Sequence, residues 1–455
     1  MKTTTHFALR ALASAALGLL IATQAGQASA MDLLGAYHQA LHLDPTSLAA
    51  TEALRAGLEK AVQGDALLRP RVTLQASLTR IDDHLNEVPA ALHPVLGADS
   101  VGTARQVGVQ MVQPLYDRAA VASRQQLHQQ TALAETRYDA ERQDLVLRVA
   151  DAYFNVLLAE ESVRVTQAEK NAVQHQHERA QARFQVGQGK ITDVHEMRAR
   201  LDAVGTSEVA ALSLLELRRA RFLETVGAAP DGLAGLAARF VPRLPQPAAL
   251  AQWQFQGEQQ NTQVKARRAA LEIAVAETGK HRLAARPTLD LTASYVTRGQ
   301  SGSLSALSAP NGERTGALGL QLTVPLYAGG ALDSRQREAV ALRSQAEQEL
   351  AAARRDVRLQ VQEGFLAMTT GVTRVAALEQ ALVSARSALE ATTLGRDLGT
   401  RTELDVLDAQ QRVFGAQLNL VQGRIDYLSG RLRLAAAAGE LGEESLRELS
   451  AWLGS

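Results

Sequence analysis

Apolar and polar residues alternate with two different periods along the chain. Around Val72, Leu74, Ala76 and Leu78 every second residue is apolar, and residues 289–295 repeat this alternation. Such alternation indicates a β-strand that presents one apolar face. After each strand region the apolar spacing changes to three and four residues, which is the period of an α-helix. The pattern therefore predicts a few strands joined to long helices, a fold of the α+β class.

The segments with the strand pattern fall into two pairs. The pairs are predicted at about residues 70–80 with 105–115, and at about 287–297 with 315–325. The connectors within the pairs, residues 81–104 and 298–315, are rich in Gly, Ser, Asn, Pro and Asp. Because these residue types favour turns, we expect both connectors to be exposed loops.

Proline is absent from two very long stretches. None lies between Pro114 and Pro230, and none follows Pro325. Both stretches are rich in Ala, Leu, Gln, Arg and Glu, which favour helices. The first helix predicted there would extend ~100 Å at 1.5 Å per residue, which argues against compact globular domains. The predicted helices are 118–187, 192–227, 328–398 and 402–436.

An apolar seam at intervals of four and three residues follows the third of these helices. It consists of Val361, Phe365, Met368, Val372 and Val375. The last predicted helix has the same rhythm. This heptad-like spacing predicts coiled-coil packing against neighbouring helices.

The two halves of the chain match each other in the same order. Residues 67–77 (LLRPRVTLQAS) correspond to residues 284–294 (AARPTLDLTAS), VGVQMVQPLY corresponds to LGLQLTVPLY, and GQGKITDV corresponds to GTRTELDV. This order indicates a duplicated unit of about 210 residues, longer than the units of solenoid proteins. We expect a first repeat over residues 31–245 and a second over residues 246–455. Each repeat would hold a helix, a strand pair, a long helix and a further helix, and the second would end in a C-terminal tail.

Residues 1–30 have the pattern of a secretory signal peptide. Lys2 and Arg10 lie in a basic start, and an apolar run follows from residue 11 to about residue 22. Ala-Ser-Ala at 28–30 then forms a small-residue cleavage site. The chain has 48 basic and 48 acidic residues, so that removal of this segment would leave a net charge of about minus two. This balance gives no bulk attraction for nucleic acid, and the absence of Cys excludes disulfides and thiolate chemistry. We therefore expect an exported protein with no nucleic-acid partner.

Two classes of protein are compatible with these features. No later segment has 18 consecutive apolar residues, but strands of about ten residues are long enough to cross a bilayer when tilted. The smallest single-chain barrels have eight strands, so this chain could close a barrel only as an oligomer. The rival interpretation is an exported periplasmic coiled-coil scaffold with a soluble β cap. The residue patterns alone leave both open.

Several segments resemble the TolC-like outer-membrane channel family. They are residues 183–202 (RFQVGQGKITDVHEMRARLD), 286–295 (RPTLDLTASY), 324–334 (VPLYAGGALDS) and 395–410 (GRDLGTRTELDVLDAQ). The resemblance implies a homotrimer in which each protomer gives four strands to one 12-stranded transmembrane β-barrel. It also implies a long periplasmic α-helical barrel, with an equatorial region that would include residues 230–247 and the tail after Gly439.

The resemblance further implies a function. The protein would be the outer-membrane exit duct of a tripartite export system for type I protein secretion, multidrug efflux or both. It would be a passive channel gated at its periplasmic helical tips, and it would lie in outer-membrane lipid with a large periplasmic extension. Its implied partners are a periplasmic adaptor, also called a membrane fusion protein, and an inner-membrane ABC or RND transporter.

Candidate functional residues gather at two predicted helix-turn-helix tips. Gly187 and Gly399 mark tight turns between helices. Asp405 and Asp408 follow the second turn three residues apart, which places both carboxylates on one helical face. In a trimer they would form two rings that favour cations, and the resemblance assigns such carboxylates to a narrow periplasmic pore entrance. The rival interpretation is a solvated helix face on which Arg401 pairs with Asp405.

The resemblance also suggests residues that keep the entrance closed. Arg401 falls at the position of a linking arginine, and Thr192 and Asp193 fall at its partner positions. Arg396 stands where the family pattern has a tyrosine that hydrogen-bonds the partner aspartate. An arginine there could replace the phenolic contact by a charged one, or could change how firmly the gate closes.

The sequence gives little support for an enzymatic function. Gly189 and Lys190 resemble the end of a phosphate-binding loop, but Phe184 occupies a required Gly position and Ile191 replaces Ser or Thr. His175 and His177 are two residues apart, unlike the i,i+4 pair of a zinc-binding helix. We therefore expect no enzymatic activity, no cofactor and no metal site.

Overall fold

The computed structural model describes residues 31–84, 99–230, 232–237, 240–302 and 312–454. The predicted signal peptide and the middle parts of both strand connectors lie outside the described residues. The chain divides into two compact units that are interleaved along the sequence. Unit 2 consists of Thr51–Tyr138 and Thr262–Arg354 and contains the sheet, whereas unit 1 consists of the other described residues and contains the helix-turn-helix tips.

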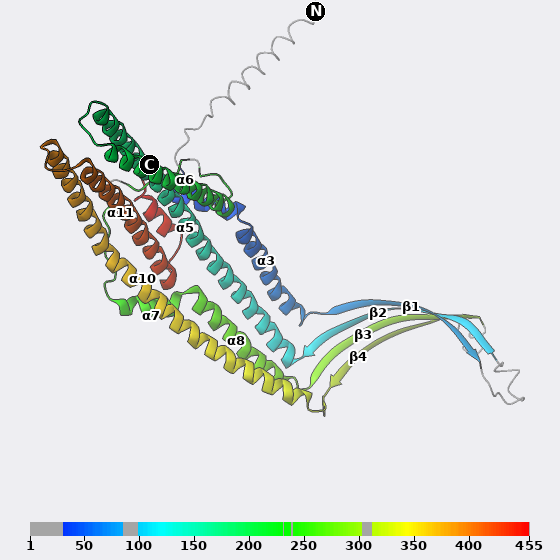
Figure 1. The fold of residues 1–455 in the computed structure, drawn as a ribbon. Coiled ribbons are helices and arrows are strands. Elements are labelled where there is room, and N and C mark those ends of the chain that lie inside the picture. The colour runs from blue at the N-terminus through cyan, green and yellow to red at the C-terminus, as the bar shows by residue number, and fades with distance from the viewer. Residues whose placement is uncertain (1–30, 85–98, 231, 238–239, 303–311, 455) are drawn as a thin grey trace, which may run out of the picture. The chain divides into compact units, whose positions relative to one another are not determined.

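Both halves of the chain show the same order of elements, namely two helices, two strands, a long helix and a further helix, and the second half ends in a short additional helix (Figure 1). The first half contains α2 (Leu33–Leu43), α3 (Pro45–Ala66), β1 (Arg71–His84), β2 (Asp99–Tyr116), α5 (Arg118–Gln185) and α6 (Ile191–Val226). The second half contains α7 (Leu250–Gln260), α8 (Thr262–Leu283), β3 (Thr288–Gly302), β4 (Gly312–Thr323), α10 (Ala331–Asp397), α11 (Glu403–Ala438) and α12 (Glu443–Ser450). No described helix has the length and apolar character needed to cross a membrane.

The strands form one antiparallel sheet in the order β1-β2-β3-β4 (Figure 1). The β1–β2 ladder continues to the pair His84 and Asp99, and the β3–β4 ladder continues to Gly299 and Gly312. The expectation that residues 81–104 and 298–315 are loops throughout is therefore wrong at their ends. Pairing continues there because the ladder is made by backbone groups and does not require apolar side chains.

The register places most of the apolar strand residues on one face of the sheet. Residues that stand directly opposite each other share a face, and Leu74, Val109 and Tyr295 form one such row. The apolar residues on this face include Val72, Leu74, Ala76, Leu78, Val107, Val109, Met111, Leu289, Leu291, Ala293, Tyr295, Leu318, Leu320 and Leu322. The other face is mostly polar and includes Thr73, Gln75, Gln110, Thr292 and Ser294.

This apolar face is open in the single chain. Leu78 is 76% exposed, Leu318 is 75% exposed and Leu320 is 66% exposed. A contiguous exposed apolar surface marks contact with another protein or with lipid. The sheet is thus a two-sided layer that needs an apolar partner on one side and tolerates water on the other.

In unit 2, polar contacts join the helices that adjoin the sheet in sequence. Asp65 of α3 accepts a hydrogen bond from Arg124 Nε of α5 at 2.7 Å. Arg267 of α8 pairs with Glu349 of α10 at 2.8 Å, and Thr278 Oγ1 donates to the Ala339 carbonyl oxygen at 3.3 Å. These contacts link α3 to α5 and α8 to α10, so each strand pair is connected to a pair of packed helices.

In unit 1, α10 and α11 pack closely along a seam that differs from the predicted one. Phe365 and Val372 are only partly buried, and the buried positions between Val361 and Val375 include Gly364 and Gly371. A side chain at Gly364 would meet the Leu434 backbone at 3.0 Å, and one at Gly371 would meet the Tyr427 ring at 3.1 Å. The prediction counted only apolar side chains, and it missed these positions because a close helix contact requires the absence of a side chain.

Residues 227–249 and the C-terminal segment also pack together in unit 1. An isolated β-bridge joins Leu236 to Leu453. The rings of Phe240 and Trp452 meet edge to face, with their centroids 5.7 Å apart, and both contact Tyr427 of α11. The two segments that the resemblance assigned to an equatorial region therefore contact each other and the final long helix.

Candidate functional site

The first helix-turn-helix tip lies between α5 and α6. Gly187 has a φ of +74°, which L-residues with a side chain rarely adopt. The Gln188 N–H donates to the Arg183 carbonyl oxygen at 2.8 Å, so the turn satisfies a carbonyl at the end of α5. Helix α6 then begins at Ile191, and the Asp193 carboxylate in its first turn lies near the positive end of the helix dipole.

The second tip, between α10 and α11, repeats this geometry. Gly399 has a φ of +75°, and the Thr400 and Arg401 N–H groups donate to the Gly395 carbonyl oxygen at 2.8 and 3.1 Å. Thr402 then caps α11. Both tips are therefore tight, hydrogen-bonded reversals between long helices.

Asp405 takes part in the capping box of α11. Its carboxylate accepts hydrogen bonds from the Thr402 N–H and from the Thr402 hydroxyl, both at 2.8 Å, and the Asp405 N–H donates to Thr402 Oγ1 at 3.1 Å. The backbone N–H and then the hydroxyl of Thr402 lower the pKa of the Asp405 carboxyl below its ordinary value. The guanidinium of Arg401 lies 4.0 Å away. Asp405 is therefore a fixed negative charge at neutral pH.

Asp408 lies on the next turn of α11 and is paired within the chain. Its Oδ1 atom lies 3.4 Å from Arg200 Nη2 of α6. Arg200 also donates to the Gln411 side chain. The two predicted ring carboxylates thus differ, because Asp408 has a close cationic partner whereas Asp405 is held mainly by its cap.

Glu403 links the two tips of the chain. Its Oε1 atom lies 3.3 Å from Arg183 Nη1 at the end of α5, and its Oε2 atom lies 3.4 Å from Arg396 Nη1 at the end of α10. The side chains of Glu403 and Arg396 are only 18% and 16% exposed. A carboxylate between two guanidinium groups in this partly buried position holds the two tips together.

The residues predicted to close the gate are only partly brought together. Arg396 pairs with Asp397 at 2.6 Å as well as with Glu403, and the hydrogen bond to Asp397 raises the pKa of Arg396. The Thr192 hydroxyl lies 3.5 Å from the Asp193 carboxylate, and both side chains are exposed. Within the described residues of one chain, no hydrogen bond or ion pair joins Arg396 or Arg401 to Thr192 or Asp193.

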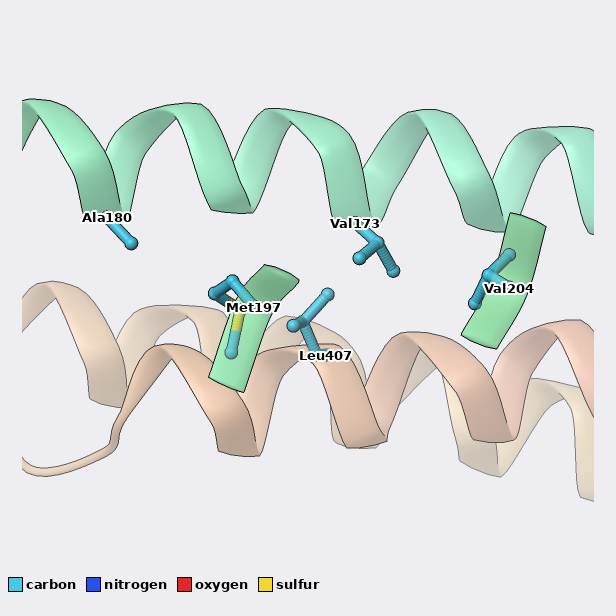
Figure 2. Close-up of a cluster of buried hydrophobic side chains, with 5 residues drawn as sticks. All are labelled: Val173, Ala180, Met197, Val204 and Leu407. Atoms are coloured by element: carbon cyan, nitrogen blue, oxygen red, sulfur yellow. The ribbon is translucent and has the colours of Figure 1, made fainter. Parts of the chain in front are cut away.

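A hydrophobic cluster positions these charged groups (Figure 2). Val173 and Ala180 of α5 point toward Met197 of α6 and Leu407 of α11, and Val204 of α6 lies farther along the same contact. Leu407 is 3% exposed. Because it lies between Asp405 and Asp408 in sequence, its burial fixes how α11 presents both carboxylates.

Glu403, Arg183 and Arg200 were not predicted from the sequence as functional residues. Glu403 stands among the charged residues of the second tip, but its partner Arg183 is far away in the sequence. A local pattern carries no signal for such a pair. The described residues contain no group of three or more acidic or histidine side chains that could hold a metal ion.

Comparison with known proteins identifies relatives along nearly the whole chain. A family model described as "Outer membrane efflux protein" matches residues 36–227 and 256–440. The outer membrane protein TolC of Vibrio cholerae is 32% identical over 443 residues, which cover 97% of each chain. The alkaline protease secretion protein AprF of Pseudomonas aeruginosa is 28% identical over 93% of this chain and 88% of its own.

Solved structures share the fold at lower identity. The outer-membrane protein VceC of Vibrio cholerae matches with a TM-score of 0.73 and 20% identity, over 90% of this chain and 96% of its own. The CmeC outer-membrane channel of Campylobacter jejuni matches with a TM-score of 0.76 and 17% identity, over 92% and 89%. These relatives do not favour the alternative of an exported scaffold. The chain belongs to the outer membrane efflux protein family and is an export channel of the outer membrane with a periplasmic extension.

Proposed function

We propose that three copies of the chain join their sheets into one transmembrane β-barrel of 12 strands, three times the four strands of the sheet. The helices form a passive periplasmic duct, and the paired tips form its gate. The duct carries exported molecules across the outer membrane.

The register of the sheet carries this proposal. One face carries most of the apolar residues of every strand and the other is mostly polar, as a barrel wall between lipid and an aqueous lumen requires. Among the described residues, β1 pairs only with β2 and β4 pairs only with β3. In lipid an unpaired strand edge leaves backbone groups without partners, so β4 of one protomer pairs with β1 of the next.

The gate consists of the two tips and the residues that link them. Asp405 and Asp408 form rings of negative charge around the threefold axis, and Asp405 contributes the greater field because Arg200 partly neutralises Asp408. Glu403 ties the tips within a protomer through Arg183 and Arg396. Between protomers, Arg401 links to Thr192 and Asp193, so the closed state depends on both kinds of contact.

Opening requires partners that supply energy. A periplasmic adaptor and an inner-membrane ABC or RND transporter dock at the tips and replace the polar links by contacts of their own. The relatives named for alkaline protease secretion and for proteases secretion support exported proteins as one cargo. The relative named as the outer membrane efflux protein BepC supports efflux as another.

Planar-bilayer recordings of the purified full-length protein test this function. We expect detergent-extracted trimers that insert from one side and show a small, steady conductance, which multivalent cations block from the side of the tips. A protein that remains monomeric in detergent and forms no conducting unit would contradict the proposed channel.

A further inference from the structure

The apolar face of the sheet does not end at the same row on every strand. Each row consists of residues that stand opposite each other across the sheet. On β4 the apolar residues lie on the helix side of Arg314 and end before it. Arg314 stands in the row of Thr297, Val107 and Ala76. On β2 and β1 the apolar residues continue farther from the helices. The upper limit of the apolar face therefore runs diagonally across the strands.

An arginine stands just beyond the main run of apolar residues on three of the strands, and all three are on the apolar face. On β2 a single further apolar residue, Val101, lies two rows beyond the arginine. Arg314 follows the apolar part of β4, Arg105 stands one row farther on β2, and Arg80 stands two rows farther on β1. All three side chains are exposed. They lie toward the strand ends that are remote from the connections to α3, α5, α8 and α10.

The diagonal matches the tilt of strands in a barrel. Two rows correspond to four residues, or about 14 Å along a strand, and the three spacings from β4 to β1 correspond to about 14 Å across the sheet. The line through the arginines therefore makes an angle of about 45° with the rows, close to the 35–45° tilt of strands in membrane barrels. In a barrel so tilted, Arg314, Arg105 and Arg80 stand at one height around the wall.

The surroundings of the three arginines leave them available for an anion. Among the residues on this face whose side chains are described, only Asp82 has a carboxylate. Asp82 already takes part in another interaction. Glu313 and Arg298 stand opposite each other on the polar face, where Arg298 donates to the Gln106 side chain at 3.1 Å. Among the described residues, no ion pair engages Arg80, Arg105 or Arg314.

The other limit of the apolar face has a different chemistry. Tyr116 of β2 pairs with Leu289 at that end, and Tyr327 follows β4 with 89% of its surface exposed. Tyrosines favour the interface between lipid tails and headgroups. The apolar band thus has an aromatic border toward the helices and a cationic border at the remote ends.

We propose that Arg80, Arg105 and Arg314 form a cationic ring on the lipid-facing wall that binds the phosphate groups of outer-leaflet lipid headgroups. This inference rests on the proposed barrel, because only a tilted, closed wall brings the three guanidinium groups to one height. Arginine presents several N–H donors to phosphate oxygens, and its stem can lie along the apolar surface while the head reaches the interface. The ring would anchor the barrel at the height of the headgroups.

The test titrates fluorescent diphosphorylated lipid A into the detergent-solubilised full-length protein. The test variant combines Arg80→Gln, Arg105→Gln and Arg314→Gln. We expect it to bind about a hundredfold more weakly, since each arginine near an anionic lipid surface contributes about fivefold. The matched control is Arg298→Gln, which removes a guanidinium at the same level on the polar face. This control, and the triple arginine-to-lysine variant, should bind nearly as the original protein does.

Further measurements separate the ring from the barrel. All variants should be recovered as trimers with unchanged conductance, and lipid A without phosphates should not bind. Equal affinity of the triple glutamine variant and the original protein, in conducting trimers, would refute the ring and leave the barrel standing. Displacement of lipid A by inorganic phosphate at the same concentration as the lipid would also refute a lipid site. An original protein that forms no trimer would overturn both proposals.

Discussion

Arg396 at the end of α10 and Glu403 at the start of α11 face each other across the second tip, with Nη1 and Oε2 3.4 Å apart. Both side chains are mostly covered, so water screens the pair less than it screens an exposed one. Because Glu403 also reaches Arg183 of α5, one carboxylate couples three helix ends. Several expected properties of the gate depend on this coupling.

Glu403→Gln should increase the conductance of the closed channel. The amide keeps the size of the side chain but removes the charge that holds Arg183 and Arg396, so the two tips separate more easily. Single-channel recordings in planar bilayers measure this change. The matched control is Glu390→Gln on the exposed surface of α10, which should leave conductance unaltered. Equal conductance of both variants would show that Glu403 does not restrain the gate.

Arg401→Ser should also raise the conductance, for a different reason. The Arg401 side chain is 61% exposed, and its contact to Asp405 is long, at 4.0 Å. It therefore remains available to the neighbouring protomer in the proposed trimer. The control is Arg386→Ser, at an exposed position on α10. A conductance that stays at its original value would remove Arg401 from the gate.

Block by a multivalent cation should depend more on Asp405 than on Asp408. Asp405→Asn should abolish most of the block, whereas Asp408→Asn should weaken it less, because Arg200 already offsets the charge of Asp408. By the same reasoning, Arg200→Gln should strengthen the block. Titration of the blocking ion in bilayer recordings ranks the variants. Persistence of the block in a double Asp405→Asn, Asp408→Asn variant would place the cation site elsewhere.

Cation block should persist to a lower pH than it would if Asp405 had the ordinary pKa of an aspartate. Hydrogen bonds from Thr402 lower the pKa of Asp405, so its charge, and the stability that the capping box adds, are lost only as pH falls through a value below 3.8. At pH 3.8, where an unperturbed carboxyl is half protonated, most of the block should remain. Thr402→Ala removes the hydroxyl and should shift the loss of block to higher pH. Identical pH profiles for the two proteins would contradict this role of the cap.

Two glycine-to-alanine substitutions should have opposite effects on stability. Gly364→Ala places a methyl group about 3 Å from the Leu434 backbone and should lower stability by about 1 kcal/mol after the gain in helix propensity. Gly415→Ala lies at an exposed position of α11, where the added methyl group meets no atom within 4 Å, and it should add up to about 1 kcal/mol of stability. Thermal unfolding followed by helical circular dichroism measures both. Equal shifts in the same direction would show that α10 and α11 do not pack as closely as described.

The sequence alone predicted the strand pairs, the long helices and their order. Alternating residues such as Val72 and Leu74 specify a strand with one apolar face, and long proline-free stretches specify long helices. The turns at Gly187 and Gly399 were also readable, because glycine is the residue that adopts a positive φ without strain. These features depend on neighbours within a few positions along the chain, so a local pattern contains them.

Only the tertiary structure decided which distant residues meet. The register put most of the apolar strand residues on one face and set Arg80, Arg105 and Arg314 on a diagonal, which no single strand reveals. The contacts of Glu403 with Arg183 and of Asp408 with Arg200 join segments far apart in the sequence. The contacts of α10 with α11 at Gly364 and Gly371 depend on how closely the two backbones approach each other, and the spacing of hydrophobic residues does not indicate this distance. Such pairings follow from packing geometry, because many alternative partners of the same chemistry would satisfy the sequence equally well.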